Sequence, residues 1–206
     1  MILEKVEVTG ILTTNSYFYI DEKTQCGFLI DPGAEAEKLL NVINQKHWHI
    51  EAVLLTHGHF DHIGVVQKVC EALAVPYYAH ENAQTYLTDP QLNLSAYMGK
   101  PIILDQATYV KAGDVIALKD QPEFNLRVID TPGHTTDSIV YYSEKNEVAF
   151  VGDTIFKGSV GATHFPGGNE ALLWRSIRDK ILTLPDQVRL YPGHFEATSV
   201  GAEKNI

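Results

Sequence analysis

Residues 56–62 read Thr-His-Gly-His-Phe-Asp-His and directly follow an apolar run, Ala-Val-Leu-Leu. A short continuous apolar run predicts a buried strand, which places the histidines at its end. Residues two apart in an extended segment point the same way, so His57 and His59 can bind one ion together. Asp61 and His62 come one turn later and can face a second ion. A lone His-x-His is common, but this fuller pattern predicts a metal site.

Three later turns each add one imidazole or carboxylate after another strand candidate. They are Pro-Gly-His ending at His134, Gly-Asp ending at Asp153, and Pro-Gly-His ending at His194. In open α/β sheets, ligands gather at the rim formed by the strand ends. An isolated Gly-His after a strand is more often structural, so these positions gain weight only from the first motif. A solvated, histidine-rich loop is the alternative interpretation of that motif.

Together the four segments supply seven candidate metal ligands, five imidazoles and two carboxylates: His57, His59, Asp61, His62, His134, Asp153 and His194. Seven ligands are too many for one tetrahedral site and suit two sites that share an aspartate. Imidazole combined with carboxylate suits zinc, iron or manganese. We therefore expect two divalent metal ions, zinc first, with iron or manganese as alternatives.

The remaining sequence alternates strand and helix candidates. We predict helices over 34–45, 63–74 and 170–182, a partly helical insertion over 81–98, and a loop for the motif itself. The strand candidates are Met1–Val8, Ser16–Ile20, Cys26–Ile30, Ala52–Leu55, Val75–Ala79, Val115–Leu118, Asn125–Ile129, Ile139–Tyr142, Val148–Val151 and, last, Val188–Tyr191. They come in antiparallel-looking groups with helices between them, which predicts a mixed α/β fold with helices covering sheets. No linker stands out, so we expect residues 1–206 to form a single domain.

Composition and charge exclude several classes of protein. The chain has 206 residues and a formal net charge of −10. An acidic surface repels phosphate backbones and no basic run is present, so nucleic-acid binding is not expected. The N-terminus lacks a basic start followed by a long apolar run, and no apolar stretch is long enough to span a bilayer. We expect a cytoplasmic protein without a membrane partner, in which Cys26 and Cys70 are buried free thiols.

The ligand pattern resembles the metallo-β-lactamase superfamily. The His-x-His-x-Asp-His run with a later His, Asp and His carries the resemblance, and residues 30–33 and 151–156 also fit. The chain is most similar to short glyoxalase II-like (hydroxyacylglutathione hydrolase-like) hydrolases, which lack the C-terminal helical domain of the longer enzymes. The resemblance covers nearly the whole chain and implies a four-layer αββα sandwich.

The resemblance also implies a role for each candidate ligand. His57, His59 and His134 would bind the first ion, Asp61, His62 and His194 the second, and Asp153 would bridge them. Asp61 would also act in catalysis by orienting the hydroxide. Asp31 would orient the ligand loop by hydrogen bonding, although an Asp before Pro is equally typical of a turn.

The implied reaction is hydrolysis of a small thioester, such as a hydroxyacylglutathione, by a hydroxide that bridges the two metals. Within the superfamily, the alternatives are an iron-dependent sulfur dioxygenase and a lactone or phosphodiester hydrolase. A nuclease and a non-catalytic metal-binding protein are further alternatives that the acidity and the complete ligand set disfavour. Neither cysteine falls at a ligand position, so antibiotic hydrolysis is not expected as the main role.

Lys157 and His164 are the candidates for substrate binding. Related short enzymes often read Phe-Lys-Gly-Ser-Val-Gly-Arg-Thr-Asp-Phe-Pro after the bridging Asp, whereas here Ala162 replaces the basic residue and His164 the Asp. The loop after His134 reads Thr-Thr-Asp-Ser in place of Thr-Pro-Gly-Ser, and Phe-Glu replaces Gly-Pro after His194. These departures leave the acyl group and the thiol of the substrate open.

Overall fold

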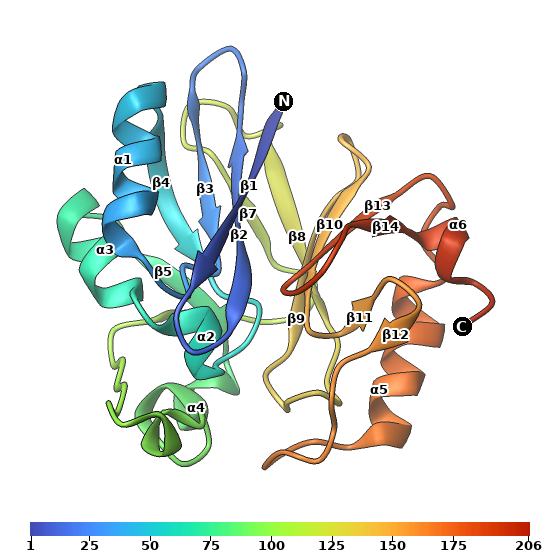
Figure 1. The fold of residues 1–206 in the computed structure, drawn as a ribbon. Helices are drawn as coiled ribbons and strands as arrows, with labels where there is room; N and C mark the ends of the chain where they lie inside the picture. The colour runs from blue at the N-terminus through green and yellow to red at the C-terminus, as the bar shows by residue number, and fades with distance from the viewer.

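Two six-stranded sheets, one from each half of the chain, form the centre of the computed structural model, which describes residues 1–206 (Figure 1). The first sheet, in spatial order, contains β1 (Ile2–Thr9), β2 (Thr13–Ile20), β3 (Cys26–Ile30), β4 (His49–Leu54), β5 (Tyr77–His80) and β6 (Thr108–Val110). The second contains β14 (Thr198–Ser199), β13 (Arg189–Pro192), β10 (Val148–Gly152), β9 (Ile139–Ser143), β8 (Asn125–Asp130) and β7 (Val115–Ala117). A small hairpin, β11 (Ile155–Phe156) with β12 (Ser159–Val160), follows β10.

The strands pair in both senses, so the expectation of antiparallel groups is only partly correct. β1, β2 and β3 are antiparallel neighbours, whereas β3 through β6 run parallel, as do β10 and β13. Parallel neighbours need a long crossover, usually a helix. Two helices provide these crossovers in the first sheet: α1 (Ala36–Lys46) joins β3 to β4, and α3 (Val66–Leu73) lies between β4 and β5.

Central strands of both sheets, namely β3, β9 and β10, are buried on two faces, which explains their apolar runs. In β2, Tyr17 and Tyr19 point into the core between the sheets, whereas Phe18 and Ile20 point to the helical side. On the opposite sheet, Tyr141 and Phe150 face the same inter-sheet core. Alternate side chains of one strand therefore belong to different layers of the molecule.

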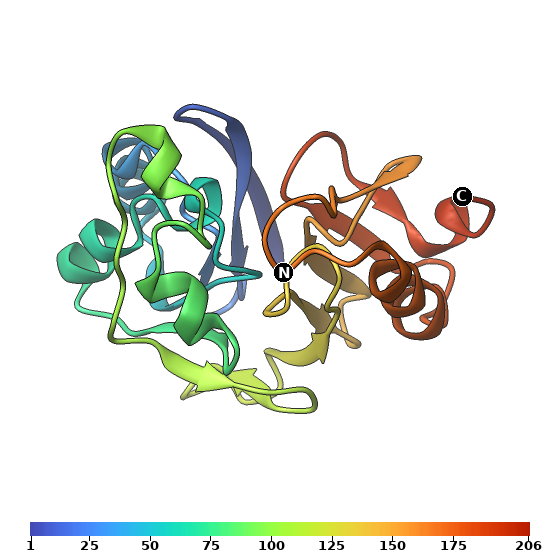
Figure 2. The same cartoon turned by 90° about the horizontal axis from the view of Figure 1, so that it is seen from below.

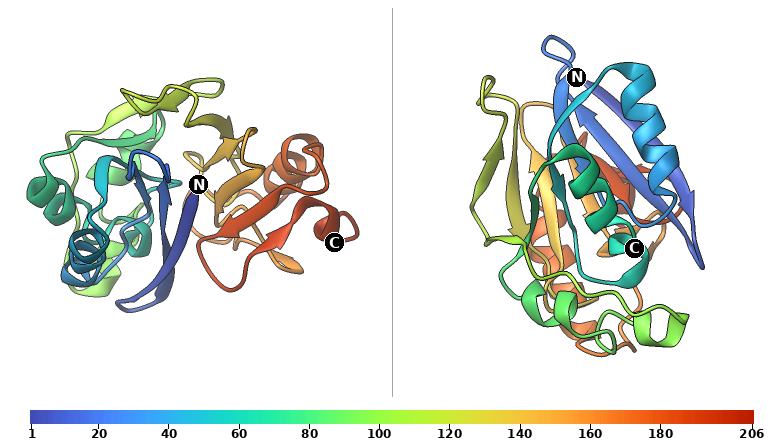
Figure 3. Two further views of the ribbon diagram at one scale, coloured as in Figure 1. Left: turned by 90° about the horizontal axis from the view of Figure 1, so that it is seen from above. Right: turned by 90° about the vertical axis from the view of Figure 1, so that its left-hand side faces the viewer.

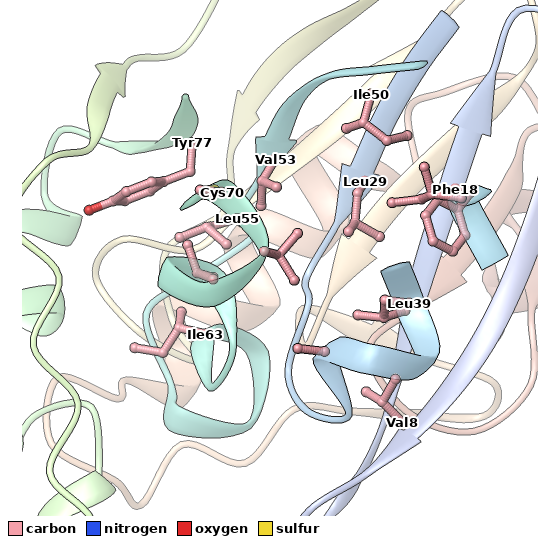
Figure 4. Packing of buried hydrophobic residues seen from close by; sticks show 14 of the residues in the cluster. Val8, Phe18, Leu29, Leu39, Ile50, Val53, Leu55, Ile63, Cys70 and Tyr77 are labelled. Atoms are coloured by element: carbon pink, nitrogen blue, oxygen red, sulfur yellow. The ribbon is translucent and has the colours of Figure 1, made fainter. Parts of the chain in front are cut away.

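Helices cover the outer face of each sheet. On α3, Val66, Val69 and Cys70 lie on one helical face and are buried against the first sheet (Figure 4). α5 (Glu170–Ser176) and the π-helical turn η2 (Ile177–Ile181) cover the second sheet. Figures 2 and 3 show the two halves of the chain side by side, with these helices on the outside. The predicted four-layer αββα sandwich is confirmed.

The predictions of a loop over the motif and of one helix over 63–74 are wrong in detail. A short helix, α2 (Phe60–Ile63), begins inside the motif, and α3 starts only at Val66. The break lies at Val65, whose backbone N–H donates to the carbonyl of Pro32 at 3.2 Å rather than to the preceding turn. Asp61 and His62 therefore lie on a helical turn, which fixes the direction of their side chains more tightly than a loop would.

Several short elements have no counterpart among the predictions. β6, β11, β12 and β14 are only two or three residues long, too short for an alternating pattern to stand out. Because β14 and α6 (Val200–Glu203) follow β13, the predicted last strand is not the last element. The insertion over 81–98 is partly helical as predicted, with α4 (Ala83–Thr88) and the 3-10 turn η1 (Ser95–Met98).

Two expectations from composition can be compared with the fold. No helix combines the length and the apolar character needed to cross a bilayer. Both cysteines are free thiols; Cys70 is buried, as expected, whereas Cys26 is only partly buried. Burial raises the pKa of the Cys70 thiol to about 12, which makes it unreactive.

Candidate metal centre

The fold brings all seven candidate ligands together at one rim. The motif follows β4, and His134, Asp153 and His194 follow β8, β10 and β13. The side chains form three overlapping groups, in each of which the ligand atoms lie within 4.8 Å of one another. The groups are His57 with His59 and His134, His57 with His62 and Asp153, and Asp61 with His62 and His194.

The first cluster contains only imidazoles, from His57, His59 and His134. His134 Nδ1 lies 2.6 Å from the carbonyl oxygen of Ala162, and His57 Nδ1 lies 3.1 Å from the Thr56 hydroxyl. A ring whose Nδ1–H donates to a carbonyl keeps the lone pair of Nε2 free, which is how second partners orient metal-binding histidines. His134 Nε2 points toward His59 Nδ1 at 2.9 Å.

The second cluster mixes imidazole with carboxylate. His194 Nε2 lies 3.2 Å from Asp61 Oδ2, and His62 Nε2 lies 3.6 Å from the same oxygen. Asp61 Oδ2 also accepts a hydrogen bond from the Thr14 hydroxyl at 3.1 Å. His194 Nδ1 faces the carbonyl of Thr13 at 2.8 Å, which turns its Nε2 into the cluster.

Asp153 lies between the two clusters. Its Oδ1 is 3.4 Å from His62 Nε2, and its Oδ2 is 3.4 Å from His194 Nε2 and 3.7 Å from His134 Nε2. Its carboxylate therefore reaches one histidine of the first cluster and two of the second, the position that a shared ligand must occupy.

Asp31 supports the motif from behind. Its carboxylate accepts from the Thr56 backbone N–H at 2.8 Å, the Thr56 hydroxyl at 2.7 Å and His62 Nδ1 at 2.9 Å. The residue is buried and has a left-handed backbone, with φ of 49°. It therefore forms a turn and hydrogen bonds to both ends of the motif at once.

Several atoms of the site have no protein partner although they are buried. They are Nε2 of His57, His59 and His62, and Oδ1 of Asp153. A buried polar atom without a hydrogen bond costs free energy, so native proteins rarely leave one. Four such atoms within one cluster of imidazoles and carboxylates fit divalent cations, which bind these atom types.

The charges of the site also suit cations. Burial lowers the pKa of His57 well below its usual value and that of His59 to about 3, so both imidazoles are neutral. Burial would also lower the pKa of His62, but the carboxylates of Asp61, Asp153 and Asp31 raise it well above its usual value. His62 in turn holds the pKa of the Asp153 carboxyl low against the effect of burial. Without an ion, protons therefore supply the positive charge that a metal would replace.

Glycines leave room for this packing. A β-carbon on Gly193 would overlap His62 Cε1 and come within 2.5 Å of Asp153 Oδ1. A β-carbon on Gly161 would overlap the backbone carbonyl of Asp153 and lie 3.1 Å from His134 Nδ1. Both positions need glycine because the chain passes directly against ligand side chains.

The two predicted substrate-binding residues lie at the periphery. Lys157 is exposed, and its ammonium pairs with Glu196 at 2.7 Å. His164 is also exposed, and its ring packs on Phe165 with 4.1 Å between centroids. Phe165 in turn lies 5.8 Å from the ring of His59. His164 is thus one side chain removed from the cluster, and Lys157 already has a partner.

Two residues beside the centre were missed by the sequence analysis. Asp137 is buried next to Gly58, and neither of its carboxylate oxygens has a hydrogen-bond partner. Related enzymes usually have glycine at this position of the loop after His134, and this difference was the available sequence signal. Tyr86 of α4 places its ring 6.3 Å from that of His59. No signal marked Tyr86, because it lies in a polar segment without a motif.

Comparisons with known proteins agree with this architecture. Residues 9–194 match the family described as the metallo-beta-lactamase superfamily. The chain is 37% identical over 197 residues to the probable metallo-hydrolase YqgX of Bacillus subtilis, with 95% of this chain and 92% of that protein covered. It is 32% identical over 207 residues to the hydroxyacylglutathione hydrolase GloC of Haemophilus influenzae, with 99% and 95% covered.

Solved structures show the same likeness. The crystal structure of the B3 metallo-beta-lactamase BLEG-1 has a TM-score of 0.92 and 34% identity, covering 100% of this chain and 97% of that one. That of TTHA1623 in a di-iron-bound form has a TM-score of 0.84 and 33% identity, covering 97% and 96%. On the family match and these relatives, the chain belongs to the metallo-beta-lactamase superfamily.

Proposed function

We propose that the chain is a dinuclear metal-dependent hydrolase of a small thioester. One observation carries the proposal: imidazole and carboxylate atoms without protein partners converge from four strand ends on two adjoining clusters, with Asp153 between them. The likeness to a hydroxyacylglutathione hydrolase supports a thioester as the substrate. The likeness to a di-iron-bound structure supports two ions and keeps iron beside zinc as the metal.

The residues of the metal centre would have distinct roles in the reaction. His57, His59 and His134 would hold one ion, Asp61, His62 and His194 the other, and Asp153 would contact both. Two ions bound there would supply Lewis acidity for a carbonyl oxygen and lower the pKa of water. Asp61, whose Oδ2 faces His194 and Thr14, would accept a hydrogen bond from the attacking water and orient it. A thiolate leaving group has a moderate pKa, so no separate general acid is required.

A β-lactam ring is the second candidate substrate, because the chain is similar to a B3 metallo-beta-lactamase over its whole length. The same reaction type would act on an amide in place of a thioester. The leaving nitrogen would then need a proton, which places a demand on the centre that a thioester does not make.

The proposed function is tested with the metal-loaded protein and a panel of thioesters, lactones, phosphodiesters and β-lactams, with oxygen consumption recorded in parallel. Thioester hydrolysis is expected to dominate. His59→Ala and Asp61→Ala should each reduce it by more than about 100-fold, because each removes a ligand. His49→Ala is the matched control, since His49 is exposed and outside the cluster. Unchanged turnover in either ligand variant would defeat the proposal, and oxygen uptake without hydrolysis would favour a dioxygenase.

A further inference from the structure

A pocket of about 350 Å³ lies beside the metal centre, on the side of the turn between β1 and β2. Its walls include Ile11 and Leu12 of this turn, Phe60 of α2, and Ile102 beyond η1. Asp61 lines it as well and also belongs to the second cluster, so the pocket and the cluster share this residue. Its volume is in the range that small-molecule sites occupy.

The walls expose large apolar side chains. Ile11 is 61% exposed and Leu12 is 48% exposed. Exposed apolar side chains that line a pocket mark a surface that a ligand covers. The turn is also fixed relative to the centre, because the Thr13 carbonyl faces His194 Nδ1 and the Thr14 hydroxyl donates to Asp61.

The charges around the pocket do not favour an anionic ligand. Lys100 is the one cation in the lining, against the carboxylate of Glu35, whereas the carboxylate of Asp61 would be bound to a metal ion. On the other side of the centre, Lys157 is engaged by Glu196. The chain as a whole carries a formal charge of −10. Apart from the metal ions themselves, the two carboxylates of a glutathione moiety would therefore find little positive potential here.

We propose that this pocket binds the acyl group of the thioester and that this acyl group is an uncharged, apolar hydrocarbon. The inference rests on the proposed hydrolase function and specifies its substrate class. The acyl carbon would lie at the metal centre, with the hydrocarbon extending past Asp61 between Leu12 and Ile102. In the reaction, the water oxygen bonds to the acyl carbon and the C–S bond breaks. The products are a carboxylate and a thiol, and one proton is released.

A series of thioesters tests the acyl preference. Acetyl, butyryl, hexanoyl and octanoyl esters of an uncharged thiol, N-acetylcysteamine, are compared with a hydroxyacylglutathione. Each methylene buried in the pocket should raise kcat/KM about fourfold until the pocket is full. The longer acyl esters should exceed the hydroxyacylglutathione. Rates that do not depend on chain length, or a preference for the glutathione ester, would overturn the inference.

Substitutions of Leu12 test whether the acyl preference arises in this pocket. Leu12→Asp should reduce kcat/KM for the octanoyl ester by at least about tenfold, because it places a carboxylate in the apolar wall. Leu12→Ser removes the apolar contact without adding charge and should act in the same direction. Val115→Asp is the matched control, since Val115 is 57% exposed on β7 and does not line the pocket. An equal loss in Val115→Asp would contradict a local effect.

A binding measurement separates this inference from the proposed function. Octanamide, an uncharged probe, should shift the NMR resonances of residues 10–12 and 102 in the wild type and much less in Leu12→Asp. If no thioester is hydrolysed but octanamide shifts these resonances, the proposed reaction fails and the apolar pocket stands. If thioesters are hydrolysed and octanamide leaves the resonances unmoved, the pocket is wrong and the reaction stands.

Discussion

At the scale of single residues, His62 shows how tightly the site is interlocked. Its Nδ1 faces Asp31 at 2.9 Å, while its Nε2 faces Asp153 at 3.4 Å and Asp61 at 3.6 Å. The three carboxylates raise the pKa of His62 although burial opposes them. A cation bound to Nε2 would replace that proton, so the same carboxylates that protonate His62 in the absence of metal favour metal in its place.

Asp137 provides a pH-dependent prediction at this scale. Burial raises the pKa of its carboxyl from 3.8 to about 6, so the folded chain holds the proton more tightly than the unfolded chain does. Its contribution to stability is therefore greatest below about pH 4 and falls as the pH rises toward 6. In metal-free protein, the free energy of unfolding of Asp137→Asn relative to that of the wild type should therefore increase by about 3 kcal/mol as the pH rises through this interval.

The measurement is urea unfolding of both chains at several pH values, in the presence of a chelator. Asp120→Asn is the control because Asp120 is exposed. A difference between Asp137→Asn and wild type that stays constant with pH would show that Asp137 does not titrate in this range.

At the scale of elements, α4 connects two loops beside the metal centre, although it lies in a polar insertion. The hydroxyl of Tyr86 lies 3.2 Å from the backbone N–H of Thr136 and 3.3 Å from the carbonyl of Pro166. The helix thus connects the loop that follows His134 with the loop that carries Phe165. The first of these loops directly follows His134, and the ring of Phe165 in the second lies 5.8 Å from that of His59. Both loops therefore border the first cluster.

Tyr86→Phe removes this connection and leaves the ring in place. We expect the free energy of unfolding to fall by about 1 kcal/mol, the usual cost of a lost hydrogen bond. Because the loops border the cluster, KM should also rise while the protein still folds. Tyr97→Phe is the control, since Tyr97 is 69% exposed. Equal effects of the two substitutions would argue against a bridging role for Tyr86.

The sequence predicted elements well where burial imposes a pattern. The strands β3 and β10 fall within one residue of their predicted bounds, because their side chains are buried on both faces. β8 does so as well, because its buried Leu126 and Val128 alternate with the exposed Arg127. The sequence did not predict the bounds of elements that depend on tertiary contacts. The break between α2 and α3 comes from Pro32, which is far away in the sequence and accepts the hydrogen bond from Val65. No local periodicity could reveal that partner.

At the scale of the whole molecule, the site lies where the two sheets meet. The first half of the chain supplies the four ligands of the motif, and the second half supplies His134, Asp153 and His194. Asn15 of β2 joins the halves directly, because its Nδ2 donates to the carbonyls of Pro192 at 3.0 Å and Phe195 at 2.9 Å. The geometry of the ligands therefore depends on the packing of the sheets and not on one loop.

This arrangement explains how much of the site was predictable. The ligand positions stood out because each follows an apolar strand, and strand ends share a rim. Apart from Asp31, which the family resemblance indicated, the supporting residues did not stand out, because their role depends on contacts between halves. Asn15, Thr14 and Tyr86 carry no motif, and only the assembled sheets bring them to the centre. The apolar pocket was hidden for the same reason.

Elemental analysis of the purified protein, after dialysis against metal-free buffer, shows whether the seven ligands bind two metal ions. We expect two divalent ions of zinc, iron or manganese per chain, bound by the two adjoining clusters. Asp153→Ala should lose at least one of them while its circular dichroism stays that of the wild type. A wild-type chain that retains no such metal, or an Asp153→Ala chain that retains both ions, would show that these residues do not form a dinuclear centre.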